Sequence, residues 1–529
     1  MKNNLNCYKD KKPEDTIKGI KKTLTKLGFT IKEKIYINPL KNVYSLRITD
    51  QNNKGTNGKG SSLIYAKASA YAEYMERLAN LLLYTPNDVD FNLACYDAKK
   101  FKVNAFKNSP LLINKYKKFF KPTIEVFNAN RDWCFAYPLT TVIGKHKNVY
   151  MPTPFMYYYG SNGMAAGNSH EEMAVQAISE IFERYMASKV VRDGYVPPVY
   201  SNNDIAKISP LLKGYINDIN KAGCHIKIYD CTLNDTFPVY AVIIFNKEKT
   251  KMSVCFGSHP NVTYGISRCI TEIFQGKDKI VFKSNVHEKL HVPKECNLDN
   301  IFGIGSGVFP GKFIESKKIS HHLKLLTKTY KSNKEMYEFY LKIIKKLKWD
   351  LYYHDASYLG IHAGQYFVPG VSDIQFPTDF LFKFYKTRND YLYLFNDFFN
   401  LKKDDQELLY ELLILMDNID LIPASLDISS KYSKESYFNY FAFISLLAVY
   451  FKDKLRYKTY LDKTYLDAYS KKEKQLGDLI SKNEKSNKEK IIKLIKSVHF
   501  DCNYSHNEQP YDLYKKLYLR QKSYYKKQK

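Results

Sequence analysis

Acidic side chains recur at helical spacing in three separate stretches of this 529-residue chain. The segments EYMER, EIFER and TEIFQGK, which end at Arg77, Arg184 and Lys277, each hold two polar side chains three residues apart and a basic residue close behind them. On a helix, residues three or four apart share one face. Carboxylates that meet without cations repel one another, whereas magnesium binds hard oxygen ligands and shares them with substrate phosphates. The recurrence therefore predicts a magnesium–nucleotide site built from helices, in which Arg and Lys hold the phosphate oxygens.

The second stretch shows this pattern most fully. Within residues 160–190, GSNGMAAGNSHEEMAVQAISEIFERYMASKV, Ser169 and Glu172 match a capping box, in which each side chain satisfies a free backbone N–H of the other. The helix that follows should bury one apolar row, Met173, Ala177, Ile181 and Met186. Its polar row consists of Glu172, Gln176, Glu180 and Glu183. A single row of this kind could be a solvated helix face, and its repetition elsewhere is what favours a site.

A glycine- and lysine-rich stretch at residues 52–62, NNKGTNGKGSS, precedes the first acidic helix, which we expect from about 63 to 83. Free N–H groups and the helix dipole make a strand–loop–helix junction a natural phosphate site. Gly55 lies too close to Lys59 for a Walker A loop, and Gly60 stands where that motif needs Ser or Thr. The stretch is equally compatible with a plain hairpin.

Strand and helix patterns alternate along the rest of the first two thirds of the chain. A helix is predicted at 13–27, beginning with Pro13 and ending at Gly28. Strands are expected at 30–37, 42–49, 225–229, 237–245, 253–257, 351–354 and 360–368, and further helices at 204–222, 262–276 and 334–348. Because neighbouring strands look locally antiparallel, the pattern favours a mixed α/β body over a parallel βαβ series.

Beyond about residue 376 the pattern becomes helical and rich in Tyr, Leu and Lys. Helices are predicted at 379–393, 405–416, 435–452 and 511–524. Paired helices of this type indicate a helical-repeat or bundle domain, although no repeat signature can be counted. We therefore expect two domains, residues 1–375 and 376–529. The basic tail KKLYLRQKSYYKKQK could contact RNA, but a solvated helix end is the simpler interpretation.

Composition limits the classes of partner. The formal net charge is +28, but 73 of the 82 basic residues are Lys and they are scattered, which argues against general nucleic-acid binding. Three of the nine Arg residues lie in the candidate site segments: Arg77, Arg184 and Arg268. The planar guanidinium group of Arg binds phosphate through two parallel hydrogen bonds, which other side chains cannot reproduce. The N-terminus lacks a secretory signal and no apolar run is long enough to span a bilayer. We expect a cytoplasmic protein that does not enter membranes.

Other polar clusters are weaker candidates. Cys224, His225 and Cys231 come nearest to a metal pattern, but reduced core thiols are the simpler interpretation. His354-Asp355 and His362 could transfer protons, although satisfied core or loop groups explain them equally simply. No Ser/His/Asp arrangement can be argued from spacing, and the catalytic residue stays unknown.

Four blocks, in order, resemble the YcaO family: GKGSSLIYAKASAYAEYMERL, SNGMAAGNSHEEMAVQAISEIFERY, CFGSHPNVTYGISRCITEIFQGK and YLGIHAGQYFVPGVSDI. The similarity covers nearly the whole chain and looks greatest to an enterobacterial member. That member is associated, as an accessory to a radical enzyme, with β-methylthiolation of an aspartate in a small-subunit ribosomal protein. The resemblance implies an α/β ATP-binding YcaO domain followed by an all-α, TPR-like domain, in a homodimer.

Members of this family use ATP to phosphorylate the oxygen of a peptide backbone amide, so that a nucleophile can displace it. The resemblance implies that the ATP contacts of this sequence are Lys59, Ser69, Arg77, Asn168, Glu172, Gln176, Arg184, Arg268, Gln275 and Lys277. It implies that magnesium is held, directly or through water, by Glu73, Glu76, Glu180, Glu183 and Glu272.

Two departures from the family pattern bear on function. Lys277 stands where members often carry Arg, and Lys loses the bidentate geometry. Azoline-forming members tend to end in a proline-rich tail, whereas this chain ends in KSYYKKQK. The leading hypothesis is therefore an ATP-utilising accessory factor that acts on a ribosomal protein with a radical methylthiotransferase partner. The alternatives are a thioamide- or azoline-forming enzyme that acts on a precursor peptide, and an adaptor that binds ATP only to hold its fold.

Overall fold

The structure is a computed structural model of the chain. It describes residues 9–37, 40–84, 96–97, 99–102, 109–111, 133–152, 159–290, 294–320, 329–373, 402–403, 406–407, 410, 442, 444–466, 471–482, 488–497 and 508–528. The chain divides into two compact units, Met1–Asp379 with Tyr514–Lys529, and Phe380–Leu513.

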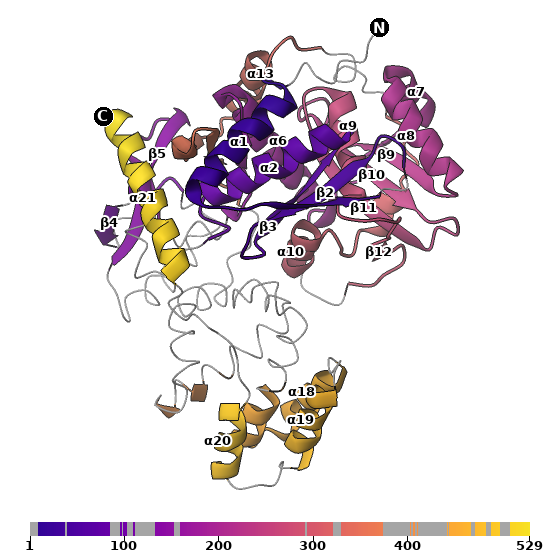
Figure 1. The fold of residues 1–529 in the computed structure, drawn as a ribbon. Coiled ribbons are helices and arrows are strands. Elements are labelled where there is room, and N and C mark those ends of the chain that lie inside the picture. The colour runs from indigo at the N-terminus through magenta and orange to yellow at the C-terminus, as the bar shows by residue number, and fades with distance from the viewer. Residues whose placement is uncertain are drawn as a thin grey trace. The chain divides into compact units, whose positions relative to one another are not determined.

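The first unit opens with a helix, a small sheet and a second helix. Helix α1 spans Pro13–Leu27 and ends as predicted at Gly28, which has the left-handed φ of 89° that favours glycine. The sheet that follows is antiparallel, with strands β1, β2 and β3 at Lys32–Tyr36, Tyr44–Thr49 and Gly55–Gly60. Helix α2, Leu63–Ala79, lies along β3 (Figure 1) and carries the first acidic pair.

Most of the glycine-rich stretch thus forms a hairpin strand, Gly55–Gly60, that leads into α2. Its glycines allow β3 to lie almost in contact with α2: a Cβ on Gly58 would lie 2.1 Å from Ala66 O and 2.5 Å from Ala70 N. Thr56 Oγ1 donates to Ala70 O at 2.9 Å and joins the strand to the helix. The close packing places Lys59, in β3, beside the acidic face of α2.

Helix α6, His170–Val191, joins the two larger sheets of this unit. It contacts β7 and β14 in one sheet and β10 and β11 in the other. Its predicted apolar row is fully buried, which confirms the helical period: Met173, Ala177, Ile181 and Met186. Because this helix lies in the core, the direction of its polar row is set by packing on both sides.

Both sheets are antiparallel, as the sequence predicted. The five-stranded sheet has the order β12-β11-β10-β9-β8, at Ser284–Asn285, Lys251–Ser258, Val239–Phe245, His225–Asp230 and Val199–Tyr200. The six-stranded sheet has the order β4-β5-β13-β14-β7, at Lys99–Lys102, Trp133–Ile143, Leu351–Asp355, His362–Phe367 and Met164–Gly167, and β6, Val149–Pro152, pairs with β5.

Strand β10 is apolar and buried at every position. Val242 and Ile244 belong to one hydrophobic cluster, with the outer helices, whereas Ala241 and Ile243 belong to another, with α6. A strand buried on both faces needs apolar residues throughout.

Helices flank the five-stranded sheet. The helix predicted at 204–222 is two helices, α7 at Asn202–Ile208 and α8 at Pro210–Lys221. The break occurs because Ser209, which precedes a proline, is extended. The remaining helical elements of this part are α9 at Val262–Ile273, α10 at Lys294–Ile304, α11 at Gly311–Ile314, α13 at Asn333–Lys346 and the short 3₁₀ turn η3 at Ser357–Leu359.

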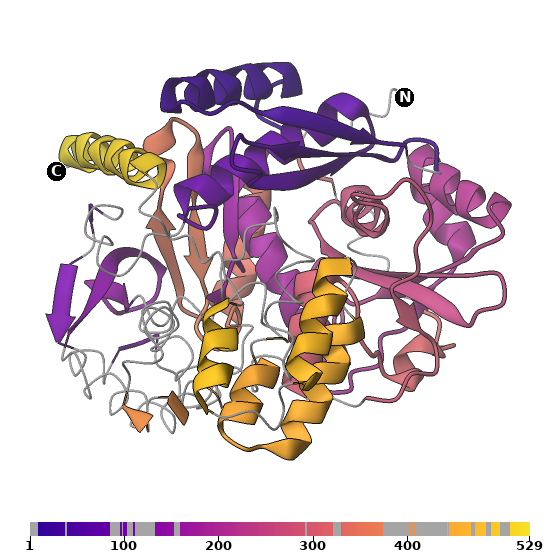
Figure 2. The ribbon, with the colours of Figure 1, turned by 60° about the horizontal axis from the view of Figure 1, so that its bottom comes forward.

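The last helix, α21, spans Glu508–Gln528, and most of it belongs to the first unit. It lies beside β13 and β14 (Figure 2), where Tyr524 Oη donates to Asp355 Oδ2 at 2.7 Å. The Asp355 carboxylate also accepts from Ser357 N at 3.0 Å and from Tyr353 Oη at 3.0 Å. Asp355 is therefore a satisfied structural carboxylate.

The described helices of the second unit are α18, α19 and α20, at Lys454–Leu466, Lys471–Lys482 and Lys488–Ser497. The helix predicted at 379–393 lies outside the described residues, and those predicted at 405–416 and 435–452 are described only in part. The TPR-like arrangement therefore stays a prediction. Among the described helices, none combines the length and the apolar character needed to cross a bilayer.

The close contact of β3 with α2 generates a test. Gly58→Ala should destabilise the first unit by about 2 kcal/mol or more, because the new methyl group meets backbone atoms that cannot move aside. Urea unfolding followed by tryptophan fluorescence measures this, since both tryptophans, Trp133 and Trp349, lie in that unit.

Gly19→Ala is the matched control. This glycine lies inside α1, and a Cβ there meets no atom within 4 Å. It should stabilise the helix by roughly 0.5–1 kcal/mol. Equal effects of the two substitutions would contradict the packing described here.

Candidate magnesium–nucleotide site

The acidic pairs of α2 and α6 meet Glu272 of α9, and Gln275 just beyond that helix, around one pocket of about 600 Å³ in the first unit. Residues of β3, β7, β11, α1 and α10 and of the segment before α1 also line it. Of the predicted ATP contacts, those that line it are Lys59, Ser69, Arg77, Asn168, Glu172, Gln176, Arg184, Arg268 and Gln275. The predicted magnesium ligands all line it: Glu73, Glu76, Glu180, Glu183 and Glu272.

Helix α2 supplies one carboxylate pair and its own counter-ion. The Arg77 guanidinium lies 3.7 Å from Glu73 Oε1 and 3.5 Å from Glu76 Oε1. Burial raises the pKa of Glu76 to about 8; Arg77 opposes the rise, and Glu73 and Glu180 add to it. In this arrangement one arginine does not fully compensate the local carboxylates, and Glu76 favours a proton near neutral pH.

Helix α6 repeats the arrangement on the facing wall. Arg184 Nη2 lies 2.9 Å from Glu180 Oε1, and its guanidinium lies 5.2 Å from the centre of the Phe302 ring. Glu180 Oε1 is nevertheless buried without a well-aligned hydrogen bond from any described residue. Burial raises the pKa of Glu183, as does the neighbouring Glu180, while Arg268 and Lys59 act in the opposite direction.

Helix α9 contacts both α6 and β3. The Arg268 guanidinium donates to Gln176 Oε1 on α6, and Lys59 of β3 forms an ion pair with Glu272. One hydrogen bond to a neutral amide and one ion pair therefore join α9 to α6 and to β3. Among the described residues, no three acidic, His or Cys side chains come together closely enough to ligate an ion in this arrangement.

The donor set nevertheless fits magnesium bound with a phosphate group. Glu76 and Glu183 have raised pKa values, and the buried Glu180 Oε1 accepts no well-aligned hydrogen bond from the described residues. Magnesium prefers such oxygen ligands, and the arginines now paired with them are suited to phosphate oxygens. Exchange of partners, in which magnesium takes the carboxylates and phosphate takes the arginines, would satisfy both sets.

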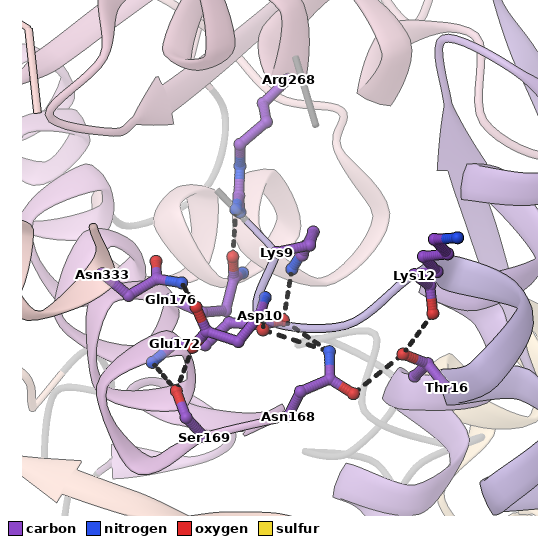
Figure 3. A network of polar contacts seen from close by, with 10 residues as sticks. All are labelled: Lys9, Asp10, Lys12, Thr16, Asn168, Ser169, Glu172, Gln176, Arg268 and Asn333. Atoms are coloured by element: carbon purple, nitrogen blue, oxygen red, sulfur yellow. Dashed lines mark hydrogen bonds and ion pairs between the residues drawn. The ribbon is translucent and has the colours of Figure 1, made fainter. Parts of the chain in front are cut away.

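The N-terminal segment closes the pocket at the first turn of α6 (Figure 3). The Glu172 carboxylate accepts from Lys9 Nζ at 3.0 Å, from the Asp10 backbone N at 2.9 Å, and from Asn168 Nδ2 at 3.1 Å. Burial alone would raise the pKa of Glu172, but Lys9 and these hydrogen bonds outweigh it and lower the pKa. Thr16 Oγ1 donates to Asn168 Oδ1 at 2.8 Å and ties α1 into the same network.

Half of the predicted capping box forms. The Glu172 backbone N donates to Ser169 Oγ at 3.0 Å, but the Glu172 side chain turns to the N-terminal segment instead of to Ser169. The Ser169 hydroxyl in turn donates to the Asp10 carboxylate, which also accepts from Asn333 Nδ2 at 3.0 Å. The sequence contained no signal that links residues 9–10 to α6, because contacts this distant leave no local pattern.

Lys277 does not line the pocket. Its ammonium group donates to the backbone carbonyl oxygens of Ile273 at 3.0 Å and Val281 at 3.4 Å, beyond the end of α9. Pocket residues that spacing did not indicate include Lys11, Tyr264 and Lys283.

The weaker candidates also lie away from the pocket. His354 Nε2 is 3.2 Å from Asp97 Oδ2, and His362 is exposed at the start of β14. Cys224 and Cys231 are buried core thiols.

Comparisons with known proteins agree with this geometry. A family model described as YcaO cyclodehydratase, ATP- and Mg2+-binding, matches residues 57–372. The ribosomal protein S12 methylthiotransferase accessory factor YcaO of Escherichia coli is 29% identical over 390 residues, which cover 69% of this chain and 66% of that protein. An uncharacterized protein of Haemophilus influenzae is 29% identical over 401 residues, 70% of this chain and 66% of its own length. The chain thus spans just under two thirds of the curated relatives it matches.

A solved structure shares the fold. A heterocyclase in complex with substrate and cofactor superposes with a TM-score of 0.51 and 16% sequence identity, over 69% of this chain and 54% of that one. The family model names ATP and magnesium as the ligands of the matched domain, and it begins within β3, so that residues 9–56 lie outside it.

The raised pKa of Glu76 generates a test of the metal ligands. Near pH 7 a carboxyl group with a pKa of about 8 is mostly protonated, and a carboxylate must lose its proton to bind metal. Magnesium binding together with ATP should therefore release protons, and the affinity should increase with pH until about 8. Calorimetric titrations in phosphate and in Tris buffer measure the proton release.

Glu76→Gln should remove most of this buffer dependence, whereas Glu33→Gln, at a carboxylate on β1 outside the pocket, should not change it. Identical heats in both buffers for the unmodified protein would contradict the role assigned to Glu76.

Proposed function

The chain belongs to the YcaO family, and we propose that it uses ATP with magnesium to activate a peptide backbone amide by phosphorylating its oxygen. The observation that carries this proposal is the pocket in which the acidic pairs of α2 and α6 and Glu272 of α9 lie beside basic side chains. These residues come from positions up to about two hundred apart in the sequence, as a composite nucleotide site requires.

Each group of pocket residues has a task in this proposal. Bound magnesium would neutralise phosphate oxygens and make the terminal phosphate easier to attack. Arg77 and Arg184, released from their glutamates, would hold phosphate oxygens, and Glu180 and Phe302 fix the starting direction of Arg184. Arg268 and Lys59 would orient the nucleotide from the α9 side, because Arg268 lies on that helix and Lys59 pairs with Glu272 of the same helix.

For the substrate, we propose a small-subunit ribosomal protein, with this chain as an accessory factor in its β-methylthiolation. The support is the 29% identity to the accessory factor of Escherichia coli that acts with a ribosomal protein S12 methylthiotransferase, as its name states. A cytoplasmic homodimer that works with a radical methylthiotransferase is part of the same proposal.

ATP binding is the first quantity to measure. ATP titrated into the protein should bind with magnesium present and much more weakly after EDTA is added. Arg184→Ala should weaken binding by roughly 1.5–3 kcal/mol, the range for a hydrogen bond to a charged group. Lys277→Ala is the matched control, since Lys277 does not line the pocket and its ammonium group contacts backbone carbonyls, and this variant should bind ATP normally.

ATP turnover separates an enzyme from an adaptor. Release of ADP and phosphate should increase when purified small ribosomal subunits are added, and Glu183→Gln should abolish that increase. Stoichiometric ATP binding without turnover, even with ribosomal subunits, would contradict the enzymatic part of the proposal and favour an adaptor. Stimulation by a short precursor peptide instead of the ribosomal subunit would contradict the substrate assignment.

A further inference from the structure

One cysteine lies on the wall of the pocket. Of the four cysteines whose side chains the structure describes, Cys224, Cys231 and Cys269 are buried and Cys255 is partly exposed. Cys255 belongs to β11 and lines the pocket, and the function proposed above does not employ it.

Two ammonium groups act on this thiol. Lys59 and Lys283 both line the same pocket. Burial lowers the pKa of each lysine, and a negative charge on Cys255 acts on both in the opposite direction. The two lysines therefore place positive charge near the Cys255 sulfur, which is the kind of surrounding in which reactive cysteines occur.

A second thiol lies directly behind the first. Cys269 of α9 packs against β11, where a Cβ on Gly257 would lie 2.6 Å from Cys269 Sγ. Cys255 and Gly257 are two residues apart in the strand and so share one face. Cys269 belongs to a hydrophobic cluster, and Cys255 packs against the same cluster.

Two glycines bring the helix and the strand together at this point. A Cβ on Gly257 would lie 2.7 Å from Gly265 O, and a Cβ on Gly265 would lie 2.7 Å from the Tyr240 ring. A disulfide needs its two Cβ atoms only about 4 Å apart, so a close helix–strand contact of this kind suits one.

We propose that Cys255 and Cys269 are a peroxide-sensitive thiol pair, whose oxidation to a disulfide disables the nucleotide pocket. The Cys255 thiolate attacks one oxygen of hydrogen peroxide, and the O–O bond breaks. Cys255 becomes a sulfenic acid, and the departing hydroxide takes up the proton that Cys255 lost, giving water. Cys269 then attacks the sulfenic sulfur, the S–S bond forms and a second water leaves, so that the peroxide gains the two electrons that the thiols lose.

The disulfide would act on ATP binding through α9. Arg268 directly precedes Cys269 in the chain, and Glu272 follows it by three residues. Their contacts with Gln176 and Lys59 join α9 to α6 and β3. A new covalent bond between α9 and β11 shifts the helix that carries these side chains and removes a thiol from the pocket wall.

Peptide mapping by mass spectrometry tests the disulfide on the full-length protein. Hydrogen peroxide should produce a Cys255–Cys269 link and abolish ATP binding, and dithiothreitol should reverse both changes. ATP with magnesium at ten times its dissociation constant should slow the reaction about 10-fold, because bound nucleotide covers the thiol.

Two variants make the test specific. Cys269→Ala should form no link, whereas Cys224→Ala, at another buried cysteine of the same hydrophobic cluster, should form the link and lose ATP binding like the unmodified protein. Absence of the Cys255–Cys269 link in the oxidised protein, or a link that leaves ATP binding unchanged, would overturn the proposal. The link is read by mass, so its failure leaves the proposed ATP function untouched.

Discussion

Repulsion among partly buried carboxylates is the constraint on which this site depends. Glu73, Glu76, Glu180 and Glu183 lie on facing helices around one pocket, and burial raises the pKa values of two of them. Breaking a buried ion pair by removing one partner costs about 3–5 kcal/mol, so each acidic helix needs its own compensating cation. Arg77 and Arg184 supply that charge in this structure. A bound magnesium ion would take over the same task and free the arginines for phosphate.

The rest of the first unit serves to hold these charges in place. Helix α6 is buried between two sheets, so its polar row cannot rotate away from the pocket. Strand β3 lies close enough to α2 to bring Lys59 to the α9 wall only because Gly58 has no side chain. The N-terminal segment secures the first turn of α6 through Lys9 and Asp10. Each of these contacts limits the motion of one charged group.

Local periodicity explains what could be predicted from the sequence. The three-residue spacing of Glu180 and Glu183 and the apolar row of α6 are properties of one helix, and both appear in the structure. Whether residues 55–60 form a loop or a strand depended instead on packing against Ala66 and Ala70, which no local pattern encodes. The Lys9–Glu172 contact, 163 residues apart in the chain, was out of reach for the same reason. Lys277 has the spacing of the third acidic segment, but the chain turns beyond α9. The Lys277 ammonium group therefore donates to a backbone carbonyl instead of entering the pocket.

A crystal structure with manganese and a non-hydrolysable ATP analogue tests the central claim most directly, because manganese replaces magnesium and is located by its anomalous scattering. The account predicts manganese peaks between α2 and α6, coordinated by glutamates of both helices, with the phosphates in contact with Arg77 or Arg184. Nucleotide bound outside this pocket, or manganese that none of these glutamates contacts, would contradict it.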